Sequence, residues 1–219
     1  MTQTIYMAPE GLEKVLREEI ERIPTLKIEK CWERLFLVTG PKRNLIFSQN
    51  TWAKPQRFEI SSISAAAKIL RSQGKLWVPC SPTLHRRTSL IQEQLPKVKT
   101  LIRQFGDPLP TLALGAWLLE DEKTLWLSKE TSSIFPNGEV PFQETKAAPS
   151  RAYLKLWEYF TLLGSTPKPT DKCLDLGSSP GGWTWVLANL GCEVISIDKA
   201  PLTPELQKNK RIQSLKNDA

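Results

Sequence analysis

The chain has 219 residues, of which 40% are hydrophobic and 24% are charged. Its formal net charge is +7 and its sequence pI is about 9.3, which suits a polyanionic partner but also an ordinary excess of lysine and arginine. No apolar run approaches the ~18 residues of a membrane-spanning helix, and the N-terminus lacks a signal-peptide pattern. We therefore expect a cytoplasmic protein with one large domain or two small ones.

The cysteine and histidine positions argue against a metal site. Cys31, Cys80, Cys173 and Cys192 show no C-x-x-C spacing, and this pattern supports neither a zinc site nor a disulfide framework. His85 is the only histidine, and no second ligand is recognisable near it. We expect buried free thiols in a reducing compartment and no bound metal.

The first part of the chain, residues 1–131, has the element order of a small α+β region. Periodicity and turn residues mark its helices and strands. The predicted elements are a strand at 4–7, an amphipathic helix at 11–22, strands at 26–31 and 34–39, a short helix at 41–49, a strand at 57–61, a helix at 64–72, a strand at 76–78, and a hairpin of 111–119 with 124–128.

The segment from 85 to 103 is the most basic part of the chain and contains a single acid, Glu93. An approximate apolar stripe predicts a helix through it, with a kink at Pro96. The charge pattern is typical both of a solvated helix face and of a surface that contacts RNA phosphates, and both readings stay open. The candidate RNA-binding residues are Arg86, Arg87, Lys97, Lys99 and Arg103.

A polar, proline-containing stretch at 132–149 has no sustained period and predicts a linker between two domains. Ser150 then stands where the N-cap of the next helix is expected. One face of that helix is apolar, and Gly164 is expected to end it.

The stretch from Cys173 to Asp198 predicts the central unit of an α/β domain. Parallel sheets bind ligands at the carboxyl ends of their strands, next to the free N–H groups of a helix N-terminus. Asp198 lies at such a strand end, so this unit outlines a nucleotide-type cofactor site. The predicted elements are a strand at 173–176, a glycine-rich turn, a helix at 183–190, a strand at 193–197 and a third strand at 211–215.

The residues of the turn distinguish among cofactors. A P-loop is unlikely to form because no lysine follows the glycines. A dinucleotide fingerprint would have glycine at Ser179, where the backbone approaches a pyrophosphate, and Pro180 offers no N–H donor there. A cofactor without phosphates remains, and S-adenosylmethionine fits, because Asp198 can take ribose hydroxyls and the small turn residues leave room for an amino acid. Asp198 would serve NAD equally well.

Two segments resemble the FtsJ/RrmJ-type ribose 2′-O-methyltransferases. Residues 175–183, D-L-G-S-S-P-G-G-W, are similar to the first motif of that family, and residues 150–156, S-R-A-Y-L-K-L, are similar to its S-R-x-x-x-K-L element. The resemblance extends to the RlmM type, which methylates a cytidine ribose of large-subunit ribosomal RNA and carries an N-terminal THUMP-containing region. Similar landmarks stand at residues 6–14, 133–136 and 148–151.

The resemblance implies a Rossmann-like, S-adenosylmethionine-dependent methyltransferase domain at 150–219, preceded by a THUMP-like α+β region at 1–131 that binds RNA. It implies that Lys155 is catalytic. For Trp183 the alternative role is helix–sheet packing, and for Asp218 it is that of an ordinary acid at a strand end. The implied cofactor-binding residues are Ser150, Ser179, Pro180, Gly181, Gly182, Trp183, Asp198 and Asp218.

The family's catalytic aspartate, second lysine and final glutamate lie after the third strand, where this sequence offers no matching positions. We therefore expect the chain to be a truncated portion of a longer RNA methyltransferase and to be inactive alone. The alternative is a non-catalytic RNA-binding paralogue with a vestigial methyltransferase fold. The sequence predicts neither the modified nucleotide nor the oligomeric state.

Overall fold

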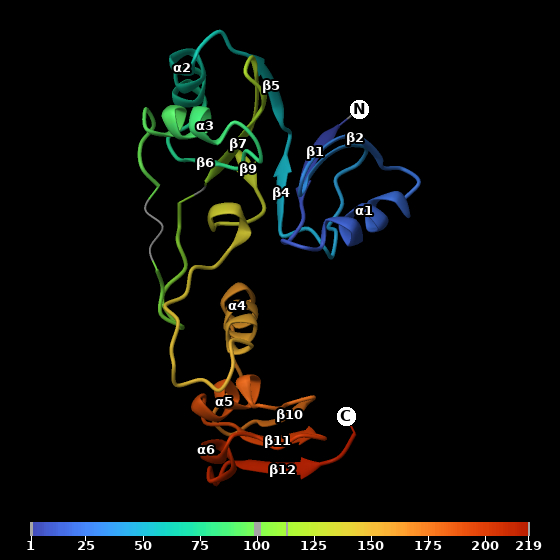
Figure 1. Cartoon of the computed structure of the whole chain (residues 1–219), viewed down its shortest axis with the longest axis vertical. Coiled ribbons are helices and arrows are strands. Elements are labelled where there is room, and N and C mark those ends of the chain that lie inside the picture. The colour runs from blue at the N-terminus through green and yellow to red at the C-terminus, as the bar shows by residue number, and fades with distance from the viewer. Residues whose placement is uncertain (1, 99–101, 113, 219) are drawn as a thin grey trace. The chain divides into compact units, whose positions relative to one another are not determined.

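The structure is a computed structural model that describes residues 2–98, 102–112 and 114–218. The chain divides into two compact units, which are described separately (Figure 1). The N-terminal unit comprises Met1–Leu101 and Pro110–Val140, and the C-terminal unit comprises Ile102–Leu109 and Pro141–Ala219. Within the described ranges, no helix is both long and apolar enough to cross a membrane.

The first sheet of the N-terminal unit consists of β1 (Gln3–Met7), β2 (Lys27–Trp32), β3 (Leu35–Thr39), β4 (Asn50–Ala53) and β9 (Glu130–Thr131). Their order is β2-β3-β1-β4-β9. Antiparallel pairing sets Ile5 opposite both Leu37 and Trp52, so large apolar side chains align across the central strands. Helix α1 (Glu13–Glu21) packs against this sheet through Leu16 and Ile20, which confirms the predicted amphipathic helix.

The second sheet consists of β5 (Gln56–Glu59), β6 (Trp77–Pro79), β7 (Gly115–Asp121) and β8 (Thr124–Ser128), in the order β5-β8-β7-β6. Helices α2 (Ile63–Gln73) and α3 (His85–Gln92) contribute to its core around the fully buried Trp77 and Trp117. Ser62 caps α2 by accepting a hydrogen bond from Ala65 N at 3.1 Å. The predicted β7–β8 hairpin is confirmed.

Two helix predictions in this unit are wrong. Residues 41–49 form turns, and the Glu19 carboxylate accepts hydrogen bonds from Ile46 N at 2.7 Å and Phe47 N at 2.9 Å. A side chain distant in sequence therefore satisfies backbone groups that a helix would have paired internally. Helix α3 ends at Gln92 instead of continuing to 103, because Pro96 offers no N–H to extend it. Strand β4 was not predicted at all.

The C-terminal unit contains β10 (Lys172–Leu176), β11 (Glu193–Asp198), β12 (Ile212–Lys216), α4 (Tyr153–Leu163), α5 (Gly182–Asn189) and α6 (Pro204–Gln207). The three strands are parallel, with β11 in the middle, and they lie side by side in Figure 1. Helices α4 and α5 share a core with Cys192 and Val194. The strand–turn–helix–strand order predicted for this unit is confirmed, and only α6 was missed.

Residues 102–109 belong to the C-terminal unit, although the sequence-based boundaries put them in the N-terminal region. Arg103 N donates to Pro141 O, and Gln143 N donates to Arg103 O, both at 2.8 Å. The Phe105 ring stacks on Trp157 with centroids 5.1 Å apart and planes 5° apart. These contacts join segments far apart in sequence, so local patterns could not reveal them.

The start of α4 also differs from the prediction. Ser150 is not its N-cap: the helix begins at Tyr153 with Ala152 at the cap, and Ser150 Oγ accepts from Ala152 N at 3.4 Å. The helix ends at Gly164 as predicted, where a φ of 71° suits glycine. The preceding turn leaves Ser150 available for contacts outside the helix.

Candidate cofactor and active site

The glycine-rich turn lies at the carboxyl end of β10 and leads into α5. Its backbone is tied to the neighbouring strand, since Gly177 N and Ser178 N both donate to Ile197 O, at 2.9 and 3.3 Å. Gly181 forms the N-cap of α5 with a φ of 114°, and a Cβ at that position would clash with the Leu206 side chain. Glycine is therefore required there by both conformation and space.

Asp198 at the end of β11 completes the turn. Its Oδ2 accepts from Ser179 N at 2.9 Å, and its Oδ1 accepts from Ala200 N at 2.8 Å. These backbone N–H groups, with that of Ala200 first, lower the pKa of the Asp198 carboxyl. Each carboxylate oxygen keeps further lone pairs, so the ionised group can accept hydrogen bonds from a ligand's hydroxyls.

Asp175 and Thr184 form a buried pair behind the turn. Thr184 Oγ1 donates to Asp175 Oδ2 at 2.6 Å, and Asp175 is only 5% exposed. Burial raises the pKa of the Asp175 carboxyl; the hydrogen bonds from Thr184 oppose this effect, and the Asp198 charge adds to it. This pair connects β10 to the first turn of α5. The sequence analysis gave Asp175 no role, although an acid inside an apolar strand is a signal of one.

Three residues predicted from separate segments come together where α4 and α5 begin. A Cβ on Gly182 would lie 2.6 Å from Ser150 Oγ and 3.1 Å from Ala152 Cβ, so the two segments can approach only because residue 182 is glycine. Trp183 Nε1 donates to Ala152 O at 3.0 Å, while the side chain stays 43% exposed. Trp183 thus packs against α4 and still presents part of its surface at the turn.

Asp218 lies beside Asp198, whereas Lys155 is not placed against any other candidate. Asn217 N donates to Asp198 O at 3.2 Å, and Asp218 Oδ1 pairs with Lys199 Nζ at 2.9 Å. Two acids therefore follow adjacent strands at one edge of the sheet. Lys155 is exposed on α4, with no side-chain hydrogen bond or ion pair to another described residue.

Residues 148–219 match the family described as FtsJ-like methyltransferase. This segment belongs to the FtsJ-like methyltransferase family. The match begins two residues before Ser150 and includes the whole strand–turn–helix–strand unit, so it contains every cofactor-site candidate of the sequence analysis.

Curated relatives carry the name Ribosomal RNA large subunit methyltransferase M. The protein from Aromatoleum aromaticum is 31% identical over 142 residues, which cover 61% of this chain and 38% of that protein. The one from Halorhodospira halophila is 34% identical over 117 residues, 52% of this chain and 34% of that protein. The chain thus spans well under half the length of these relatives. Among solved structures, TrmN from Thermus thermophilus is 13% identical with a TM-score of 0.40, covering 100% of this chain and 74% of that one, which is too low to support an argument.

The FtsJ-like unit also holds Arg103, one of the predicted RNA-binding residues. Its side chain is only 7% exposed, and its guanidinium donates to Asp107 O at 2.8 Å and to Pro108 O. A guanidinium used in this way cannot serve as a surface contact for phosphate. The prediction for Arg103 is therefore wrong, because the sequence gave no sign of its burial.

The other predicted RNA-binding residues lie in or after α3 of the N-terminal unit, away from the FtsJ-like segment in sequence. Arg86 and Lys97 are exposed, and Lys99 lies outside the described residues. Arg87 is half-buried and donates to Glu122 O at 3.0 Å, so it is partly committed to the protein itself. Among the described residues, no group of three or more His, Cys, Asp or Glu side chains could hold a metal ion.

Proposed function

We propose that this chain acts in S-adenosylmethionine-dependent 2′-O-methylation of RNA ribose, with large-subunit ribosomal RNA as the substrate. The observation that carries the proposal is the Asp198 carboxylate, held by Ser179 N at the strand edge of an FtsJ-like segment. The substrate follows from the relatives, which are named Ribosomal RNA large subunit methyltransferase M.

The hydrogen bonds of the turn favour a cofactor without phosphates. Gly177 N and Ser178 N are bonded to Ile197 O, Ser179 N is bonded to Asp198, and Pro180 has no N–H. A pyrophosphate needs such amides to be free and pointing outward, as in the anion-binding loops of nucleotide enzymes. Here these amides orient a carboxylate instead, which suits the ribose hydroxyls of S-adenosylmethionine.

Space and chemistry at the turn fit the same cofactor. A Cβ on Gly177 would meet no atom within 4 Å, so the turn faces open space. Asp198 would accept from the ribose hydroxyls, Asp218 from the adenine amino group, and Ser150, Trp183 and the turn residues Ser179 to Gly182 would line the methionine part. When bound, S-adenosylmethionine supplies a methyl group activated on a sulfonium.

Lys155 is the residue we assign to the reacting ribose hydroxyl. An unactivated hydroxyl is a poor nucleophile, so it needs a positioned group that orients it and takes its proton. The Lys155 amine has no competing partner among the described residues and lies within one turn of the α4 start that Trp183 contacts. The THUMP-like N-terminal unit would hold the RNA, with Arg86 and Lys97 as phosphate contacts.

The test has two arms. Calorimetry compares S-adenosylmethionine with NAD: tighter binding of S-adenosylmethionine, weakened at least about 10-fold by Asp198→Ala, is expected from the loss of a charged acceptor. Tighter NAD binding would overturn the cofactor assignment. Methyl transfer to large-subunit ribosomal RNA is then measured with this chain and with the full reading frame that encodes it. RNA binding without transfer by either protein would favour the non-catalytic RNA-binding alternative.

A further inference from the structure

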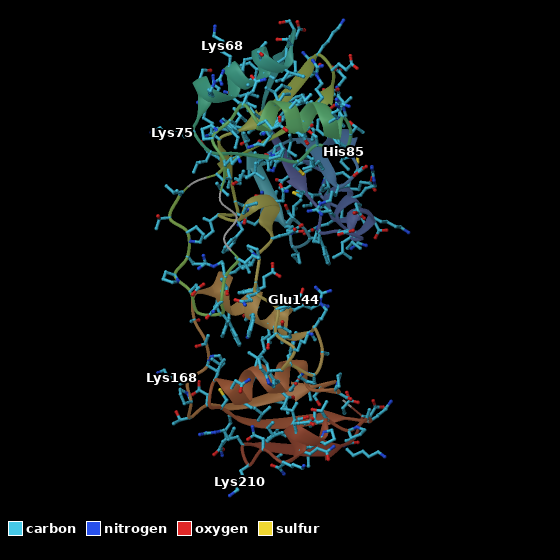
Figure 2. The ribbon with its side chains drawn as sticks, turned by 60° about the vertical axis from the view of Figure 1, so that its left-hand side comes forward. Lys68, Lys75, His85, Glu144, Lys168 and Lys210 are labelled. Atoms are coloured by element: carbon cyan, nitrogen blue, oxygen red, sulfur yellow. The ribbon has the colours of Figure 1, made fainter. Side chains whose placement is uncertain are left out.

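The N-terminal unit contains a cavity of about 310 Å³ that the methyl-transfer proposal does not use. The buried side chains of Met7 and Leu35 form part of its apolar wall, together with Pro79. Trp32 and His85, the first residue of α3, also line it, and His85 is labelled in Figure 2. The volume is at the small end of the range for ligand sites and suits a single flat ring system.

Two polar atoms in the wall of this cavity lack partners. Arg34 and Asn137 both line it, and Arg34 Nε and Asn137 Oδ1 are buried without a hydrogen bond to any described residue. The guanidinium is held from its other end, because Nη2 donates to Glu139 Oε1 at 3.3 Å. Asn137 has a left-handed backbone with a φ of 54°. Buried polar atoms are rarely left unpaired, and one donor and one acceptor here lack a partner.

The charges around the cavity disfavour a phosphate. The carboxylates of Glu33 and Glu139 line it with a single guanidinium, that of Arg34. Cys80 adds no charge at neutral pH, since burial raises the pKa of its thiol to about 11. The cavity therefore has more hydrogen-bond acceptors than donors and a net negative charge. It suits a neutral ligand that donates more hydrogen bonds than it accepts.

Trp32 provides an aromatic surface for such a ligand. Its ring lies 5.9 Å from that of Trp126, centroid to centroid, and Trp126 Nε1 donates to Glu120 Oε2 at 2.7 Å. The indole is thereby held in place by packing while it lines the cavity. Unpaired RNA bases are commonly bound by stacking on aromatic side chains combined with hydrogen bonds to their edges.

We propose that this cavity holds an unpaired RNA nucleobase that carries an exocyclic amino group. The ring nitrogen or carbonyl of the base would accept from Arg34 Nε, and the amino group would donate to Asn137 Oδ1 and to a nearby carboxylate. Uracil has one N–H donor and no amino group, so it would leave acceptors unpaired and bind more weakly. The inference rests on the proposed RNA substrate and adds base selectivity within the N-terminal unit.

Nucleosides test the cavity without phosphate contacts or methyl transfer. Ligand-observed NMR titrations of the chain with adenosine, cytidine and uridine should show saturation of the base protons of the first two, and at least about 10-fold weaker binding of uridine. Arg34→Lys keeps the charge and removes Nε–H; Asn137→Gly removes the amide and suits the positive φ. Both should reduce adenosine and cytidine binding to the uridine level, whereas Arg22→Lys, an exposed arginine of α1's C-cap, should change nothing.

The inference is overturned if no nucleoside binds, if all three bind equally, or if both cavity variants bind like the original chain. Circular dichroism checks folding; should Arg34→Lys unfold, Asn137→Gly alone decides. A chain that binds these nucleosides but transfers no methyl group in any form keeps this inference and loses the proposed function. A chain that methylates RNA without nucleoside selectivity does the reverse.

Discussion

Ser179 N donates to Asp198 Oδ2 at 2.9 Å, and this bond joins the turn after the first strand to the end of the second strand. The turn therefore offers a fixed carboxylate at the position where nucleotide enzymes usually present free amides. The first four predictions concern this arrangement and the residues that support it.

Cofactor binding should be insensitive to mild acid. Backbone N–H groups lower the pKa of Asp198, so its ionised form persists below the ordinary titration range of aspartate, about pH 4. Calorimetry with S-adenosylmethionine should give the same affinity at about pH 7 and pH 5, with loss only at lower pH. A fall centred near pH 6 would mean that Asp198 is not the group that titrates.

Asp175→Asn should flatten the dependence of stability on pH. Burial raises the pKa of Asp175, so the folded state binds its proton more tightly than the unfolded chain does. The contribution to stability is thus full below the unfolded pKa and is lost as pH rises through the folded one. The amide keeps an acceptor for Thr184 and removes this loss. Urea denaturation across pH 3 to 7, about the range of a shifted carboxyl, measures it.

Thr184→Val serves as the contrasting variant. It preserves shape but removes the donor to Asp175, leaving a buried carboxylate oxygen unpaired. We expect a loss of about 1–3 kcal/mol in the free energy of unfolding at neutral pH. The same variant in the Asp175→Asn background should cost less; equal costs would show that the hydrogen bond contributes little.

Gly181→Ala should destabilise the C-terminal unit more than Gly177→Ala. Both glycines have positive φ, but a Cβ at 181 would also clash with Leu206, whereas one at 177 would meet nothing within 4 Å. Strain alone costs about 1–3 kcal/mol, and the clash adds to it. Thermal unfolding compares the two; identical melting temperatures would contradict the close contact with Leu206.

Lys155→Ala should lower methyl transfer without weakening the cofactor. A positioned proton-transfer group contributes about 10²–10⁴-fold, and Lys155 is not among the residues assigned to S-adenosylmethionine. The measurement is kcat in whichever protein form transfers methyl groups, with the cofactor Kd taken separately. Lys210→Ala, an exposed lysine of the same unit labelled in Figure 2, is the matched control. A parallel fall in both variants would point to charge alone.

Replacing Arg86 and Lys97 by glutamate should weaken RNA binding at low salt and reduce the slope of log affinity against log salt by about 2 or more. Both side chains are exposed, so folding should be unaffected. Arg103→Ala should instead lower thermal stability, because the buried guanidinium holds the 103–108 turn. An unchanged salt slope in the double variant would place the RNA surface elsewhere.

Local features of the sequence were sufficient for the strand–turn–helix–strand unit between 172 and 198. Its glycines, apolar strands and terminal acid each act within a few residues, and the structure has these elements within one residue of the predicted positions. Predictions failed where a distant group decided the backbone. Residues 41–49 did not form a helix because their amides bond to Glu19, and α3 ended early before Pro96.

The sequence by itself thus determined the order of elements around the turn, the family of residues 148–219 and the acid at the end of β11. Only the tertiary structure decided that the turn's amides bind Asp198, that Ser150 meets Gly182, and that Arg103 is buried in the C-terminal unit. The physical reason is that short-range periodicity records which face of an element is apolar. The partner of a polar group is set by residues that come near only after the chain has folded.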